Sequence, residues 1–156
     1  MDKFKKVLGT SFYLGFLPGA PGTWASLAAL IPIFLLQYHF GTVSLFLFLI
    51  VSSIITLWTA DACTNAWGDD PGQMVMDEWA GQSVAFLFIN FNSNMFHNVA
   101  VLLVGFGFFR LFDILKPFGV NKLQDLRGGW GILMDDLLAG FYANLCLNSL
   151  IFLFIK

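Results

Sequence analysis

Long stretches without any charged residue are the feature that most constrains how this chain can fold. No Asp, Glu, Lys or Arg occurs in residues 7–60, 79–109 or 137–155. A helix needs about 20 apolar residues to cross the hydrocarbon core of a bilayer. The chain is only 12% charged, about half of the roughly 25% found in average soluble domains. These values favour a polytopic membrane protein over the alternative, a very apolar soluble helical bundle.

Breaker residues and polar turns divide the chain into about five helices, which we expect to form one domain over residues 1–156. The predicted fold is therefore an all-α membrane helical bundle. Residues 9–23 are crowded with Gly and Pro, so they predict a re-entrant or interfacial loop in place of a helix. The predicted helices that follow this loop cover about 23–40, 42–60, 71–90, 99–115 and 131–155.

The third of these helices has a recognisable start. Asp70 can cap it, Pro71 suits the first helical position, and Gln73 stands where it can complete a capping box. A helix that starts here would place Asp77 in its second turn. The favourable field at the helix N-terminus, which acts mainly in the first turn, would then explain Asp77 poorly.

A topology of five spans with the lysine-rich N-terminus in the cytoplasm places almost all charged residues on one side of the membrane. Every acidic and basic residue except Lys156 then falls on the cytoplasmic side, which agrees with the positive-inside rule. We therefore expect a multi-pass membrane protein whose acidic residues face the cytoplasm. The few basic residues are dispersed, which argues against a nucleic-acid partner. The sequence leaves open whether copies associate into a homo-oligomer.

Acidic residues lie in three places between the apolar segments. Charged side chains next to apolar membrane segments carry a free-energy cost of desolvation, so their presence calls for a structural or functional explanation. A simple explanation is that they complement helix dipoles. Adjacent carboxylates repel each other, however, and hard divalent cations such as Mg²⁺ accept clusters of oxygen ligands. We therefore predict a Mg²⁺ site whose ligands come from Asp77, Glu78, Asp113, Asp135 and Asp136. Four of these acids are predicted to be catalytic, namely Asp77, Glu78, Asp113 and Asp136.

Four other residues are predicted to bind a phosphate. Arg110 and Lys116 lie three residues before and after Asp113, so the three form one charged stripe on a helix. Gly22 and Thr23 end a Gly-rich loop that leads into a helix, where backbone N–H groups can hold an anion. That second signal is weak by itself, because the hydroxyl of Thr23 could equally cap the helix.

Four sequence blocks, taken together and in this order, resemble the bacterial phosphatidylglycerophosphatase A family. They read GFLPGAPGTWASL, MVMDEWAG, FRLFDILKP and GGWGILMDDLLAG. The resemblance implies a Mg²⁺-dependent phosphatase of the cytoplasmic membrane that faces the cytoplasm. It also implies phosphatidylglycerophosphate as the substrate, with phosphatidylglycerol and inorganic phosphate as products. A different reading is a small transporter or channel subunit, whose acids should lie near the middle of the bilayer.

Overall fold

The computed structural model describes residues 2–117 and 119–154, and its regular elements in those ranges are helices. The sequence-based expectations for residues 118, 155 and 156 lie outside the described residues. The helices are α1 (Asp2–Gly9), the short 3₁₀ helix η1 (Leu14–Phe16), α2 (Pro21–Phe40), α3 (Thr42–Trp67), α4 (Met76–Ala85), α5 (Met95–Leu115), α6 (Val120–Leu123) and α7 (Gly129–Phe154).

The prediction of an all-α membrane bundle of about five helices is confirmed, but the length predicted for one of these helices is wrong. Among the described residues, four helices are long and apolar enough to cross a bilayer, namely α2, α3, α5 and α7. The helix expected over 71–90 is α4, with ten residues. At 1.5 Å per residue it is about 15 Å long, roughly half the thickness of the hydrocarbon core.

The start predicted for this helix at Asp70 is also wrong. Asp70 adopts a left-handed conformation with φ of 47°, and α4 begins only at Met76. The backbone before α4 is bound to the N-terminal region instead. The N–H of Val75 donates to the carbonyl of Gly9 (2.9 Å), and the Ser11 hydroxyl donates to the carbonyl of Val75 (3.2 Å). These bonds hold the segment before α4 outside the helix.

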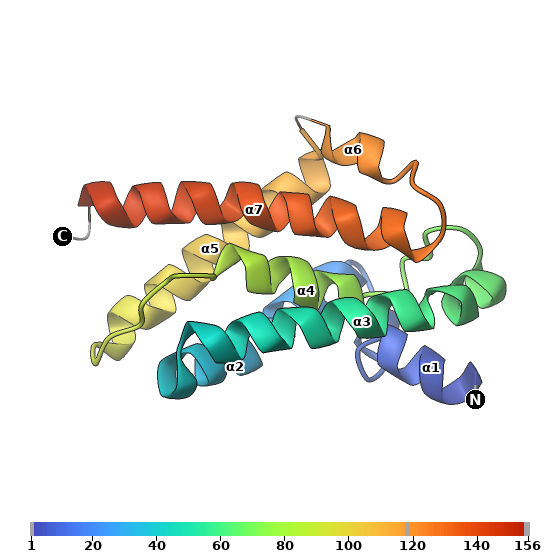
Figure 1. Cartoon of the computed structure of the whole chain (residues 1–156), viewed down its shortest axis with the longest axis horizontal. Helices are drawn as coiled ribbons and strands as arrows, with labels where there is room; N and C mark the ends of the chain where they lie inside the picture. Colours follow the sequence, from blue (N-terminus) through green and yellow to red (C-terminus); the bar gives the residue numbers. More distant parts are fainter. Residues whose placement is uncertain (1, 118, 155–156) are drawn as a thin grey trace.

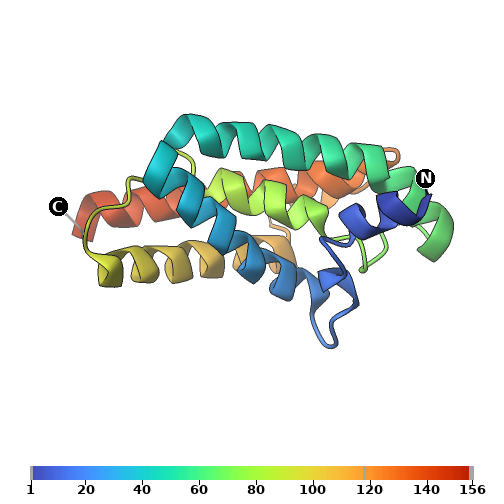
Figure 2. The same ribbon diagram turned by 90° about the horizontal axis from the view of Figure 1, so that it is seen from below.

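Helix α4 lies in the middle of the bundle. Both ribbon views place it among α2, α3, α5 and α7 (Figures 1 and 2), and it contacts each of these four helices. Eight of its ten residues are buried. A short helix thus occupies the position that is most completely screened from the surroundings.

After α4 the chain continues without helical structure to the opposite end of the bundle, where α5 begins (Figure 1). Backbone without its own helical hydrogen bonds needs partners inside a membrane protein. The Gln37 amide donates to the carbonyl of Ile89 (2.6 Å). The Asn144 amide donates to the carbonyls of Ala85 (3.1 Å) and Leu87 (2.8 Å). Helix α4 and the segment after it together make one pass along the bundle, so the chain runs along the bundle five times. Helix α1 and the end of α7 lie at opposite ends of the bundle (Figure 1).

The predicted N-terminal loop is present as irregular structure around η1. Three consecutive residues, Ser11, Phe12 and Tyr13, have positive φ, which continuous helix does not allow. The first spanning helix begins at Pro21, slightly earlier than predicted, with proline in its first turn, where its missing N–H costs nothing. The loop therefore delivers the start of α2 to the same end of the bundle as α1.

Close packing of α4 against α7 depends on two glycines. A Cβ at Gly140 would collide with the carbonyl oxygen of Gly81, and a Cβ at Gly81 would lie 2.6 Å from the carbonyl oxygen of Asp136. The backbones of the two helices can approach this closely only because both residues lack a side chain.

We predict that Gly140→Ala destabilises the folded protein by about 1–3 kcal/mol, because the added methyl group forces α4 and α7 apart. Thermal unfolding of the purified protein in detergent measures this effect. Gly107→Ala in α5 is the matched control, since nothing lies within 4 Å of its added Cβ. Equal unfolding temperatures for the two variants would show that the glycine contact does not limit the packing.

Candidate functional site

A polar cavity of about 330 Å³ opens at the end of the bundle where α1 and α6 lie. Its walls come from the start of α2, the segment before α4, the first turn of α4, the end of α5 and the second turn of α7. Six acidic and two basic side chains line it: Asp70, Asp77, Glu78, Asp113, Asp135, Asp136, Arg110 and Lys116. The structure thus brings all five predicted metal ligands to one cavity.

The first turn of α4 carries Asp77 and Glu78. Because α4 starts at Met76 and not near Asp70, the helix dipole favours both acids. Their side chains are nevertheless buried, with residue exposures of 8% and 7%. A buried carboxylate needs hydrogen bonds or a cation as well as a favourable helix end.

Glu78 has such partners. Arg110 donates from Nη1 to both Glu78 oxygens, at 2.7 Å (Oε1) and 2.6 Å (Oε2). The Ser26 Oγ lies 2.6 Å from Glu78 Oε2 and 2.8 Å from the carbonyl oxygen of Gly22. A serine hydroxyl has one proton, so it donates to one of these oxygens at a time. Ser26 was not predicted as a site residue; its one available signal is its position one helical turn after Gly22.

Gly22 lies directly against the Glu78 carboxylate. A Cβ at this position would collide with Glu78 Oε1 and would lie 3.3 Å from Arg110 Nη1. Gly22 therefore leaves the space in which the acid and the guanidinium meet. Thr23, its predicted phosphate-binding neighbour, is not among the residues that line the cavity.

The predicted charged stripe on α5 is only partly present. Arg110 Nη1 lies 2.8 Å from Asp113 Oδ2, so this pair forms on one helix face. Lys116 pairs instead with Asp135 on α7, with 2.6 Å between Nζ and Oδ2. Lys116 ends α5 in a left-handed conformation with φ of 45°, just before Pro117, which disfavours helix in the residue before it. This turn takes Lys116 out of the helical spacing on which the stripe depends.

Two carboxylate oxygens in the cavity have no hydrogen-bond partner among the described residues. They are Asp77 Oδ1 and Asp136 Oδ2, and both are buried. The remaining acid, Asp135, accepts from the backbone N–H of Asp136 (3.0 Å) as well as from Lys116. Asp77 and Asp136 are therefore the acids whose buried oxygens are still available to a ligand.

The charges perturb the protonation of the groups that lie outside the spanning helices. Burial raises the pKa of Asp77 well above its ordinary value, and the negative charge of Glu78 raises it further. Burial also raises the pKa of Glu78. Burial would lower the pKa of Lys116, but its hydrogen bond to Asp135 and the charge of that acid outweigh burial, so the pKa is raised. A cation in the cavity would favour the ionised carboxylates.

The donor set fits a hard divalent cation in its chemistry, because its acidic groups offer only oxygen. In the described part of the chain, however, no group of three or more Asp, Glu, His or Cys side chains is arranged to hold a metal ion. Glu78, Asp113 and Asp135 are engaged by Arg110 or Lys116. The predicted Mg²⁺ site therefore remains a prediction, and Asp77 and Asp136 are the predicted ligands that retain an unpartnered buried oxygen.

The fold and this cavity define an α-helical membrane protein with a buried acidic site at one end. Comparison with protein families matches residues 7–151 to the family Phosphatidylglycerophosphatase A. The chain belongs to the phosphatidylglycerophosphatase A family, as its four sequence blocks indicated, and it is a phosphatase. Membership of an enzyme family speaks against the alternative of a transporter or channel subunit.

Three curated relatives cover most of the chain. A Bacteroides thetaiotaomicron protein named "Putative phosphatidylinositol-3-phosphatase" is 37% identical over 88% of this chain and 87% of its own length. Phosphatidylglycerophosphatase A of Haemophilus influenzae is 34% identical over 88% of this chain and 82% of its own length. The Escherichia coli protein of the same name is 29% identical over 86% and 76%. No solved structure matches the chain.

We predict that Gly22→Ala lowers phosphatase activity strongly, because its methyl group would displace the Glu78 carboxylate from Arg110. Gly72→Ala is the matched control: Gly72 lines the same cavity, but nothing lies within 4 Å of its added Cβ. Phosphate release and thermal unfolding should be measured for both variants. Wild-type activity of Gly22→Ala would contradict the proposed need for close contact at this position.

Proposed function

We propose that this protein is a Mg²⁺-dependent phosphatidylglycerophosphatase. It hydrolyses the terminal phosphate monoester of phosphatidylglycerophosphate to phosphatidylglycerol and inorganic phosphate. The observation that carries the proposal is the convergence of acids from α4, α5 and α7, together with Arg110 and Lys116, on one cavity. Family membership supplies the substrate, since two relatives are named for this reaction.

Arg110 and Lys116 bind the terminal phosphate in this proposal. Arg110 contacts Ser26, Glu78 and Asp113 through Nη1, and its buried Nε has no hydrogen-bond partner among the described residues. A guanidinium has five N–H donors and an ammonium has three, so both groups retain donors for phosphate oxygens. Glu78 and Asp113 hold the guanidinium in place, and Asp135 does the same for the Lys116 ammonium.

Asp77 and Asp136 would hold Mg²⁺, because each has a buried oxygen available. When bound, the ion would offset charge on the phosphoryl oxygens and lower the pKa of a coordinated water. We favour attack by water over attack by a carboxylate, since the sequence lacks a known aspartyl-phosphate signature. Trapping of a covalent phosphoenzyme would overturn that choice.

The position of the cavity at one end of the bundle suits a lipid substrate with a hydrated head group and apolar acyl chains. The acids occupy the first turn of α4, the end of α5 and the second turn of α7, all toward one end of the bundle. We place this end at the cytoplasmic face of the bacterial cytoplasmic membrane. The basic residues of α1 lie at the same end, which accords with the positive-inside rule.

A second substrate is favoured by one observation. The relative at 37% identity carries a name that denotes action on a 3-phosphorylated inositol lipid. Both lipids present a phosphate monoester on a polyol attached to a diacylglycerol phosphate. The same cationic groups could therefore hold either monoester, and contacts to the polyol would decide between the two.

Purified protein should release phosphate from phosphatidylglycerophosphate in the presence of Mg²⁺, and EDTA should abolish this release until Mg²⁺ is restored. Phosphatidylinositol 3-phosphate, assayed in parallel at equal surface concentration, should react more slowly. Faster phosphate release from the inositol lipid would show that phosphatidylinositol 3-phosphate is the preferred substrate of the two. No release from either lipid with Mg²⁺ present would refute the proposed reaction.

Asp77→Asn, Asp113→Asn and Asp136→Asn should each reduce kcat by at least about 10-fold, as expected for loss of a metal ligand or its support. Asp77→Asn and Asp136→Asn each remove a negative charge from a crowded cavity, so these two variants should fold at least as well as wild type. Asp113→Asn also removes a partner of the buried Arg110 guanidinium, so thermal unfolding of this variant must be measured beside its activity. Asp125→Asn, on an exposed residue outside the cavity, is the control. Full activity of any one variant, with normal Mg²⁺ dependence, removes that residue from the site.

A further inference from the structure

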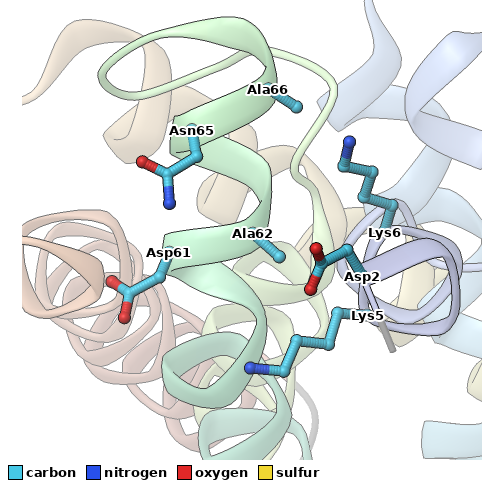
Figure 3. A pocket seen from close by; sticks show the side chains of 7 residues that line it. All are labelled: Asp2, Lys5, Lys6, Asp61, Ala62, Asn65 and Ala66. Carbon is cyan, nitrogen blue, oxygen red and sulfur yellow. The ribbon is translucent and has the colours of Figure 1, made fainter.

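Charged side chains line a pocket of about 330 Å³ between α1 and the C-terminal part of α3, but they do not converge on one point. Lys5 and Lys6 point apart with Asp2 between them, and Asp61 is directed away from α1 (Figure 3). The acidic cavity differs, because there three carboxylate oxygens and a serine hydroxyl surround one guanidinium nitrogen. That serine, Ser26, has no part in the phosphatase chemistry described above.

The Nη1 nitrogen of Arg110 has more acceptors around it than protons to give. Glu78 Oε1 lies at 2.7 Å, Glu78 Oε2 at 2.6 Å and Asp113 Oδ2 at 2.8 Å. A guanidinium has five N–H groups, of which Nη1 carries two. Two protons cannot give a full hydrogen bond to each of three carboxylate oxygens. One of these buried oxygens therefore depends on another donor.

Ser26 supplies such a donor to Glu78 Oε2. Its Oγ lies 2.6 Å from this oxygen and 2.8 Å from the carbonyl oxygen of Gly22. The shorter distance falls in the range of about 2.5–2.7 Å that is typical of a hydroxyl donating to a carboxylate. The charge of Glu78 therefore makes its oxygen the stronger acceptor for the single Ser26 proton. Ser26 is completely buried, so bulk water does not compete for this proton.

A simpler explanation for a helical serine is a bond to the carbonyl four residues earlier. Ser83 in α4 is a serine of this kind: it is completely buried, and its hydroxyl donates to the carbonyl of Trp79 at 2.7 Å. Ser26 lies within reach of the corresponding carbonyl in α2, but it also contacts a carboxylate of the site. Ser83 is therefore a matched control, since it has the structural bond without the contact to the site.

We propose that Ser26 is a positioning residue for phosphate binding. With Ser26 donating to Glu78 Oε2, the two protons of Arg110 Nη1 serve Glu78 Oε1 and Asp113 Oδ2. The N–H groups of Nη2 and of the buried, unpartnered Nε then remain for phosphate oxygens. Without the hydroxyl, the unsatisfied Glu78 oxygen would draw a second guanidinium nitrogen away from the phosphate. This role rests on the phosphatase function proposed above, in which Arg110 binds the terminal phosphate.

Titration of inorganic phosphate into the purified full-length protein with Mg²⁺, followed by ³¹P NMR, tests this role. Ser26→Ala should raise the Kd of phosphate about tenfold, as expected for loss of one hydrogen bond to a charged group. Ser83→Ala should bind phosphate as wild type does. In steady-state assays, Ser26→Ala should raise KM for the lipid by a similar factor and change kcat less. A merely structural defect would instead lower the fraction of active enzyme, and with it the apparent kcat.

A double-mutant cycle shows whether Ser26 acts through Glu78. In a Glu78→Gln background, adding Ser26→Ala should change the Kd of phosphate by less than about twofold, because the carboxylate that Ser26 supports is absent. Additive effects of the two changes would overturn the proposal, and so would an unchanged Kd in Ser26→Ala. If Ser26→Ala does not fold, Ser26→Cys takes its place, since a thiol is only a weak donor.

Phosphate binding and lipid turnover are measured separately, so the two proposals can fail separately. If wild type binds phosphate but releases none from either lipid, the proposed reaction is refuted and the binding cycle still decides the role of Ser26. If wild type hydrolyses the lipid while Ser26→Ala keeps full affinity for phosphate, only the role of Ser26 is refuted. Absence of phosphate binding by wild type in the presence of Mg²⁺ would also overturn that role.

Discussion

The contact between Glu78 and Arg110 is the interaction around which the site is built. Moving an isolated charge from water into a protein interior costs several kcal/mol, and both groups are largely removed from solvent. The pair is tolerable because each member has further partners, Ser26 for the acid and Asp113 for the guanidinium. Gly22 supplies the space for the contact. One ion pair thereby fixes the start of α2, the first turn of α4 and the end of α5 relative to one another.

The need to give buried charges partners inside the protein also explains why the central helix α4 is short. The acids of α4 must lie inside the bundle, so the helix that carries them cannot also present a long apolar face to lipid. The backbone that continues beyond α4 is held by the amides of Gln37 and Asn144. Such side-chain donors replace the water that exposed carbonyls would otherwise need. The bundle thus gains a polar interior at one end while its outer helices remain apolar.

The excess of acidic over basic side chains distinguishes this cavity from an ordinary buried ion-pair network. Arg110 and Lys116 are shared among Glu78, Asp113 and Asp135, and Asp77 and Asp136 still have unpartnered oxygens. The proposal of a cation at this site is argued from those unpartnered oxygens, and the proposal of a phosphate from the remaining donors of the two basic groups. That combination is what a metal-dependent phosphatase acting on a lipid requires.

The sequence alone was sufficient for the class of fold and for most of the charged residues that line the cavity, although Asp70 lines it as well and the predicted Thr23 does not. Charge-free stretches long enough to span a bilayer leave few choices besides a helical membrane bundle, and charges placed between them must cluster or face water. The partners of each charge were decided only by the tertiary structure. The left-handed turn at Lys116 directs it to Asp135 on another helix, and helical spacing does not contain that information. The length of α4 was likewise set by contacts far away in the sequence. The Val75 N–H donates to the Gly9 carbonyl and the Ser11 hydroxyl donates to the Val75 carbonyl, and these bonds hold the residues before Met76 out of the helix.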